Sequence, residues 1–111
     1  MKVKVNEATQ AQLNWMVAMA ENWAGADFEV KPYCTDWSQG GPIIEQEMIE
    51  LVPQSGALWD AMYRNQHIPN DGPTPLIAAM RCYVASKLGD EIDVSDDLVW
   101  DELIYEKGDE E

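Results

Sequence analysis

The segment over residues 74–89 constrains the fold most, because it carries a complete set of helix signals. Thr74 is a good N-cap residue, and Pro75 has the fixed backbone angle that suits the first position of a helix. No glycine or proline interrupts residues 76–88, and Gly89 suits the position just after the last turn. The sequence therefore predicts one long helix here.

Apolar side chains cover more than one side of this predicted helix. One stripe consists of Ile77, Met80, Val84 and Leu88, and a second consists of Leu76, Ala79 and Tyr83. A helix that is apolar on several sides packs in the middle of a domain. Arg81 is a cation among these apolar residues, and we expect it to form an internal ion pair, for example with Glu45, or to hold a phosphate.

Shorter patterns predict the other elements. Residues 2–5 alternate polar and apolar side chains, as a first strand does, and a capping box over residues 9–12 begins an N-terminal helix that Gly25 ends. The expected elements that follow are a strand over residues 28–33, a loop over 34–42, a strand within 43–52, a turn at 53–56, a short helix or strand over 58–64, a loop over 65–73 and a short C-terminal helix over 95–103.

This order predicts an α+β fold, with a small antiparallel sheet packed with one long central helix, one N-terminal helix and a short C-terminal helix. We expect a single domain over residues 1–104 and an acidic, frayed tail over residues 105–111. The 111 residues, of which 46% are hydrophobic, are enough for one core. Five Trp and six Met are more large apolar groups than one small core hides, which favours a homo-oligomer.

The net charge of −14 is distributed unevenly. Residues 1–88 carry ten acids and six bases, whereas residues 89–111 carry eleven acids and one base. Such a charge repels nucleic acid, because phosphate binding depends on Lys and Arg. It attracts basic partners, although solubility alone also explains it. We therefore expect no direct nucleic-acid binding.

The sequence favours a protein of the cytoplasm without a membrane-spanning segment. No apolar run approaches the roughly 20 residues of a membrane helix, and the N-terminus lacks the apolar middle of a secretion signal. Cys34 and Cys82 lie far apart, which predicts two reduced, buried thiols. With one histidine, they do not supply the paired ligands of a zinc site, so no metal is expected.

Two segments have the composition of a binding site. The predicted loop over residues 35–42 joins Asp36 and Trp37 to the adjacent Gly40 and Gly41, and such glycines let a backbone approach a ligand or another chain. Trp37 can stack on a ring or, alternatively, fill the core. The helix start at Thr74 can bind an anion, although capping alone also explains this residue.

Signals for catalysis are weak. His67 is expected to be a surface imidazole, and Ser38 and Ser86 lack the context of a nucleophile elbow. Neither a phosphate loop nor a dinucleotide fingerprint is present. We therefore predict no catalytic residue and no cofactor; a general base of a small hydrolase would have to be Asp36, Glu45 or His67.

Four stretches, residues 1–4, 13–18, 35–45 and 72–89, together resemble the NinX family of lambdoid bacteriophages and their prophages. The chain departs from the family pattern at Asn14, where we expect Asp. The resemblance implies a phage or prophage origin and expression in an infected bacterium. The family is a domain of unknown function, so the resemblance implies no activity.

We predict a non-catalytic binding protein that captures a small anionic, nucleotide-like ligand in the conflict between phage and host. The predicted ligand-binding residues are Asp36, Trp37, Gly40, Gly41, Glu45, Thr74 and Arg81. One alternative is an acidic inhibitor that docks on a basic host protein or mimics DNA towards it. The other alternative is a small hydrolase.

Overall fold

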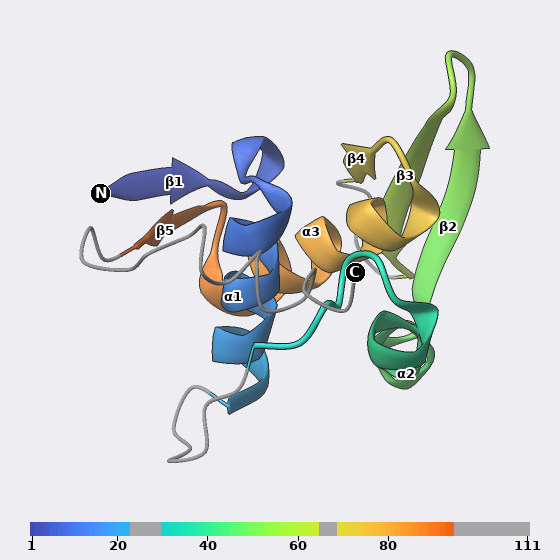
Figure 1. Ribbon diagram of the computed structural model, residues 1–111. Coiled ribbons are helices and arrows are strands. Elements are labelled where there is room, and N and C mark those ends of the chain that lie inside the picture. Colours follow the sequence, from blue (N-terminus) through green and yellow to red (C-terminus); the bar gives the residue numbers. More distant parts are fainter. Residues whose placement is uncertain (23–29, 65–68, 95–111) are drawn as a thin grey trace, which may run out of the picture.

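The computed structural model describes residues 1–22, 30–64 and 69–94. In chain order, the elements are strand β1 (Lys2–Lys4), a single 3-10 turn η1 (Val5–Glu7), helices α1 (Gln10–Asn22) and α2 (Trp37–Glu47), strands β2 (Ile49–Gln54), β3 (Leu58–Tyr63) and β4 (Asn70–Gly72), helix α3 (Pro75–Leu88) and strand β5 (Glu91–Asp93) (Figure 1). This mixture of helices and antiparallel strands confirms the predicted α+β class.

Helix α3 lies in the middle of the molecule, as its two apolar stripes predict. It packs against α1 on one side and against β2, β3 and β4 on the other, and α2 contacts it as well (Figure 1). The buried residues of α3 are Leu76, Ile77, Ala78, Ala79, Met80, Cys82, Tyr83 and Val84. Because these residues point in every direction around the helix axis, α3 contributes to the core on all sides.

The strands form two small antiparallel sheets. In the first, β1 pairs with β5, and the N-terminal ammonium lies 3.3 Å from Asp93 Oδ1. In the second, the strand order is β2-β3-β4, with Leu51 opposite Ala61 and Asp60 opposite Asp71. Both cysteines are buried thiols that form no disulfide among the described residues, as predicted.

The predicted loop over residues 34–42 is wrong, because helix α2 begins at Trp37. Asp36 is its N-cap, and Pro42 lies inside the helix. Adjacent glycines and a proline disfavour a helix in an isolated chain. Tertiary packing overrides that preference here, since Gly40 is buried against the rest of the molecule.

Other element bounds differ from the prediction. Residues 30–33 form no strand, whereas residues 28–29 lie outside the described ranges. Strand β2 begins only at Ile49, after α2, and continues through the predicted turn to Gln54. Residues 58–63 are a strand, which is one of the two predicted alternatives. Residues 70–72 form β4 instead of a loop, because pairing with β3 satisfies their backbone. The predicted C-terminal helix and tail lie outside the described residues.

Within the described ranges, no helix combines the length and the apolar character needed to cross a membrane.

Candidate functional site

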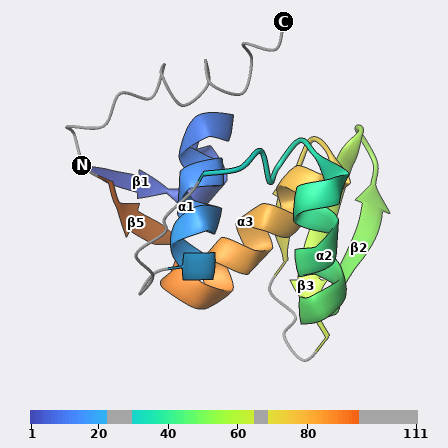
Figure 2. The ribbon, with the colours of Figure 1, turned by 60° about the horizontal axis from the view of Figure 1, so that its bottom comes forward.

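The first turns of all three helices meet at one pocket of about 210 Å³. Its lining residues are Gln10, Cys34, Thr35, Trp37, Thr74, Leu76 and Ile77. Gln10 begins α1, Trp37 begins α2, and Leu76 and Ile77 lie in the first turn of α3. In Figure 2 the three helices start toward the same, upper side of the view. We call this cavity the helix-start pocket.

Each of the three helix starts is capped by a side chain. Each cap accepts a hydrogen bond from a backbone N–H group. Thr9 Oγ1 accepts from Gln12 at 3.1 Å, Asp36 Oδ1 from Ser38 at 2.9 Å, and Thr74 Oγ1 from Ile77 at 3.1 Å. Caps satisfy only part of a first turn, and the first amides of a helix have no acceptor within it. At this pocket, the backbone N–H groups of Trp37 and Leu76 are first-turn groups without an acceptor in their own helix.

The pocket has an apolar floor, an aromatic mouth and no charged lining side chain. Leu76 and Cys34 are buried, whereas Trp37 is 52% exposed. Beneath the floor, the Cys34 amide donates to Oδ1 of the buried Asn14 at 3.0 Å. Asn14 Nδ2 has no hydrogen-bond partner among the described residues. Asp36 lies in the sequence between two lining residues, Thr35 and Trp37, and its Oδ1 also accepts a hydrogen bond from the Ser38 hydroxyl.

The structure places the predicted site residues in two groups. Trp37 and Thr74, far apart in the sequence, line the same pocket, and Asp36 caps the helix that carries Trp37. The other predicted residues, which do not line it, are Gly40, Gly41, Glu45 and Arg81. The close backbone approach expected at the glycines exists at Gly40, but it is an approach to other parts of this chain.

Arg81 does not form the expected ion pair with Glu45. Its Nη1 donates to the backbone carbonyl of Asp71 at 2.7 Å, and among the described residues it has no ion pair with a carboxylate. The packing of α3 against β4 brings the guanidinium to this carbonyl. Among the described residues, the buried Nε atom of Arg81 has no hydrogen-bond partner. Arg81 therefore fastens α3 to β4.

A family model described as bacteriophage P22 NinX matches residues 4–87. The chain belongs to the NinX family. The matched range includes every residue that lines the helix-start pocket and ends just before the strongly acidic residues 89–111. A search of curated proteins finds no match for the chain.

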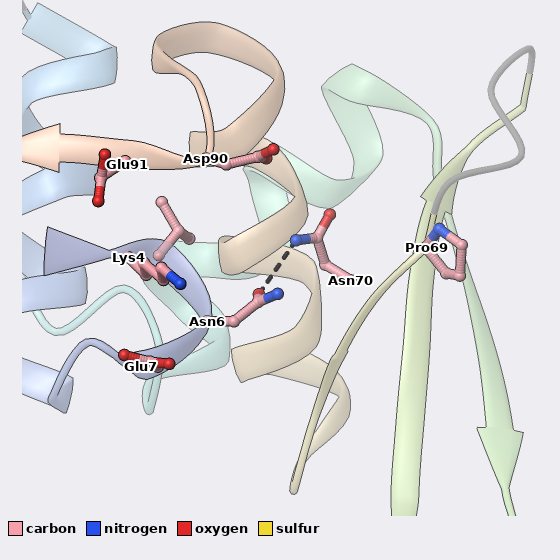
Figure 3. Close-up of a pocket in the computed structure, with 8 residues that line it drawn as sticks. Lys4, Asn6, Glu7, Pro69, Asn70, Asp90 and Glu91 are labelled. Carbon is pink, nitrogen blue, oxygen red and sulfur yellow. Dashed lines mark hydrogen bonds between the residues drawn. The ribbon is translucent and has the colours of Figure 1, made fainter.

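The NinX-family chain has a second, larger pocket of about 520 Å³ between the two sheets (Figure 3). Its lining residues are Lys4, Val5, Asn6, Glu7, Pro69, Asn70, Asp90 and Glu91. The amide of Asn70 donates to Asn6 Oδ1 at 3.1 Å across it. Sequence reasoning missed this pocket because its walls come from three separate segments with no shared motif.

Side chains that are able to take part in acid–base or nucleophilic chemistry also meet where α2 and β3 end against α3. Tyr63 donates to Glu47 Oε1 at 3.0 Å, Ser86 Oγ lies 2.9 Å from the Tyr63 hydroxyl, and Lys87 Nζ lies 3.3 Å from Glu47 Oε1. Burial is the main cause that raises the pKa of Tyr63 to about 12 and the pKa of Cys82 to about 11.

Both groups therefore keep their protons at neutral pH, so neither is a ready base for Ser86. Ser38 serves the Asp36 cap, and His67 lies outside the described residues. No cluster of three His, Cys, Asp or Glu side chains suited to a metal occurs in the part of the chain that the structure describes.

Proposed function

We propose that the chain is a non-catalytic binding protein that captures a small anionic, nucleotide-like ligand at the helix-start pocket. The observation that carries this proposal is the convergence of three helix N-termini on one pocket with Trp37 at its mouth. The N-terminal end of a helix is positive and presents free N–H groups, so it favours an anionic group. An exposed indole offers a face on which a base can stack.

The size of the pocket limits what it holds. Its volume of about 210 Å³ is smaller than the roughly 300–1,000 Å³ of pockets that enclose a whole ligand. A phosphate group therefore enters the pocket, and the ring of the ligand lies outside on Trp37. Thr35 and Thr74 supply hydroxyl donors, and the amides of Trp37 and Leu76 supply N–H donors.

The negative charge of Asp36 repels an anion in the helix-start pocket, because its carboxylate is close to the start of α2. Its Oδ1 is engaged in capping, and an asparagine in its place would cap equally well without the charge. Asp36→Asn therefore separates the two effects. If the ligand is anionic, the substitution strengthens binding while the helix start stays intact.

Calorimetric titration with AMP, cyclic AMP and ADP-ribose tests the proposal, with adenosine as the uncharged comparison. We expect a phosphate-bearing ligand to bind more tightly than adenosine. Trp37→Ala should weaken that binding by roughly fivefold or more, since base stacking contributes about 1–3 kcal/mol. Asp36→Asn should strengthen it.

Met48→Ala is the matched control, because Met48 is exposed at the opposite end of α2. It should leave the affinity unchanged. Failure of every ligand to bind at millimolar concentration would contradict the proposal. So would a Trp37→Ala variant that binds as tightly as the unaltered protein.

A further inference from the structure

The sheet β2-β3-β4 has one face that the described helices do not cover. Tyr63 contacts both α2 and α3 through Glu47 and Ser86, so both helices lie on the side of the sheet where Tyr63 points. Leu51 and Trp59 pack against the core on the same side. Side chains alternate along a strand, so the residues between them point to the other side.

We call that other side the outer sheet face. Its residues, by strand alternation and register, are Glu50, Val52, Gln54, Leu58, Asp60, Met62 and Asp71. Val52 is 37% and Leu58 is 41% exposed. Gly72 points towards α3, since a Cβ there would lie 2.8 Å from the Ala78 amide nitrogen, which leaves the neighbouring Asp71 on the outer side. Figure 1 shows α3 on the inner side of the sheet.

Three acidic residues also lie on the outer sheet face. Asp60 of β3 lies directly opposite Asp71 of β4, and Glu50 of β2 lies diagonally across from Asp60. Like charges that face each other across a sheet destabilise it. None of these three carboxylates has a hydrogen bond or ion pair with the described residues, although Asp60 is only partly exposed. Two bases lie near these acids: Arg64 just beyond β3, and Arg81 of α3, whose guanidinium donates to the backbone carbonyl of Asp71.

We propose that the outer sheet face docks a segment of another protein in which Lys or Arg alternates with apolar residues. Three acids interleaved with Val52, Leu58 and Met62 are complementary to such a segment in both charge and hydrophobicity. The chain's own alternating run of Lys and Val, at residues 2–5, does not occupy this face, because it is paired with β5 as strand β1. A second copy, with net charge −14, would bring acid against acid.

This surface shares no residue with the helix-start pocket, so the two proposals fail or succeed separately.

The test uses the full chain and a synthetic ten-residue peptide of alternating Lys and Val. Fluorescence anisotropy measures the affinity, and amide chemical shifts in NMR spectra map the contact. We expect shifts over residues 49–63 and 70–72, and weaker binding of a Lys-Gly peptide of equal charge.

The decisive comparison is between two variants that each lose three negative charges. The first carries Glu50→Gln, Asp60→Asn and Asp71→Asn; the second carries Glu7→Gln, Asp90→Asn and Glu91→Gln in the pocket between the sheets. The first should bind the Lys-Val peptide at least roughly tenfold more weakly, and the second should change less than twofold. The first variant should remain folded, as far-ultraviolet circular dichroism would report, because it relieves repulsion.

Three results would overturn the proposal. An equal loss of affinity in both triple variants would mean that only net charge matters. Equal binding of the Lys-Val and Lys-Gly peptides would exclude an apolar contribution. A dimer in solution that Leu58→Lys dissociates would place a second copy on the outer sheet face.

Discussion

Gly40 and Gly41 are adjacent in α2 but have different surroundings. A Cβ at Gly40 would lie 2.3 Å from the Tyr33 carbonyl oxygen and 2.7 Å from Leu76 Cδ1. Apart from its chain neighbours and the nearby helix backbone, a Cβ at Gly41 would meet only the Trp37 ring, at 3.6 Å, which is ordinary van der Waals contact. The first glycine is thus required by the packing of α2, and the second is not.

Alanine substitutions at the two glycines should therefore have opposite effects. Gly40→Ala is expected to lower the free energy of unfolding by about 1–3 kcal/mol, because backbone atoms must move to admit the methyl group. Gly41→Ala is expected to raise it by about 0.5–1 kcal/mol, because alanine loses less backbone entropy in a helix. Urea denaturation of each variant measures both. Equal effects of the two substitutions would show that α2 does not pack as described.

At the scale of elements, Tyr63 joins α2, β3 and α3 through Glu47 and Ser86. Its pKa is raised from 10.0 to about 12, chiefly because burial disfavours the charged phenolate. The unfolded chain therefore releases this proton first. The resulting contribution to stability is complete below pH 10 and is lost as the pH rises from 10 to about 12.

Tyr63→Phe should make the free energy of unfolding fall less steeply between pH 10 and 12. Part of the fall will persist, because burial also raises the pKa of Tyr83 and Cys82. Denaturant titrations at several pH values measure the difference. Ser86→Ala, as a comparison, should move the loss to higher pH, since the Ser86 hydrogen bond lowers the pKa of Tyr63. An unchanged pH profile in Tyr63→Phe would contradict the buried environment.

At the scale of the whole molecule, the net charge of −14 dominates. Self-repulsion of this kind destabilises a compact state, and salt screens it. The described residues have few ion pairs for salt to weaken: the N-terminus with Asp93, and Lys87 with Glu47.

Raising the salt concentration from low ionic strength to roughly 0.5 M should therefore raise the melting temperature by a few degrees. Thermal unfolding followed by circular dichroism measures it. The triple variant Glu7→Gln, Asp90→Asn and Glu91→Gln should show a smaller increase, because less charge remains to be screened. A melting temperature that falls with salt would mean that attractive pairs outweigh the repulsion.

Local signals in the sequence determined the elements that depend on neighbours along the chain. The Thr74 cap, the uninterrupted run to Leu88 and Gly89 define α3, and the capping box defines the start of α1. Each of these signals acts within one turn of a helix, so a single sequence is enough to read it. The choice of Trp37 and Thr74 as site residues also came from local composition.

Only the tertiary structure decided what depends on contacts between distant segments. It made a helix of residues whose glycines and proline predict a loop, because Gly40 fits against Tyr33 and Leu76. It brought Trp37 and Thr74 to one pocket and set Asp60 opposite Asp71. It also made the Asp71 backbone carbonyl, instead of the Glu45 carboxylate, the hydrogen-bond acceptor of Arg81. These outcomes depend on helix packing and strand register, which bring together side chains far apart in sequence and which no local pattern specifies.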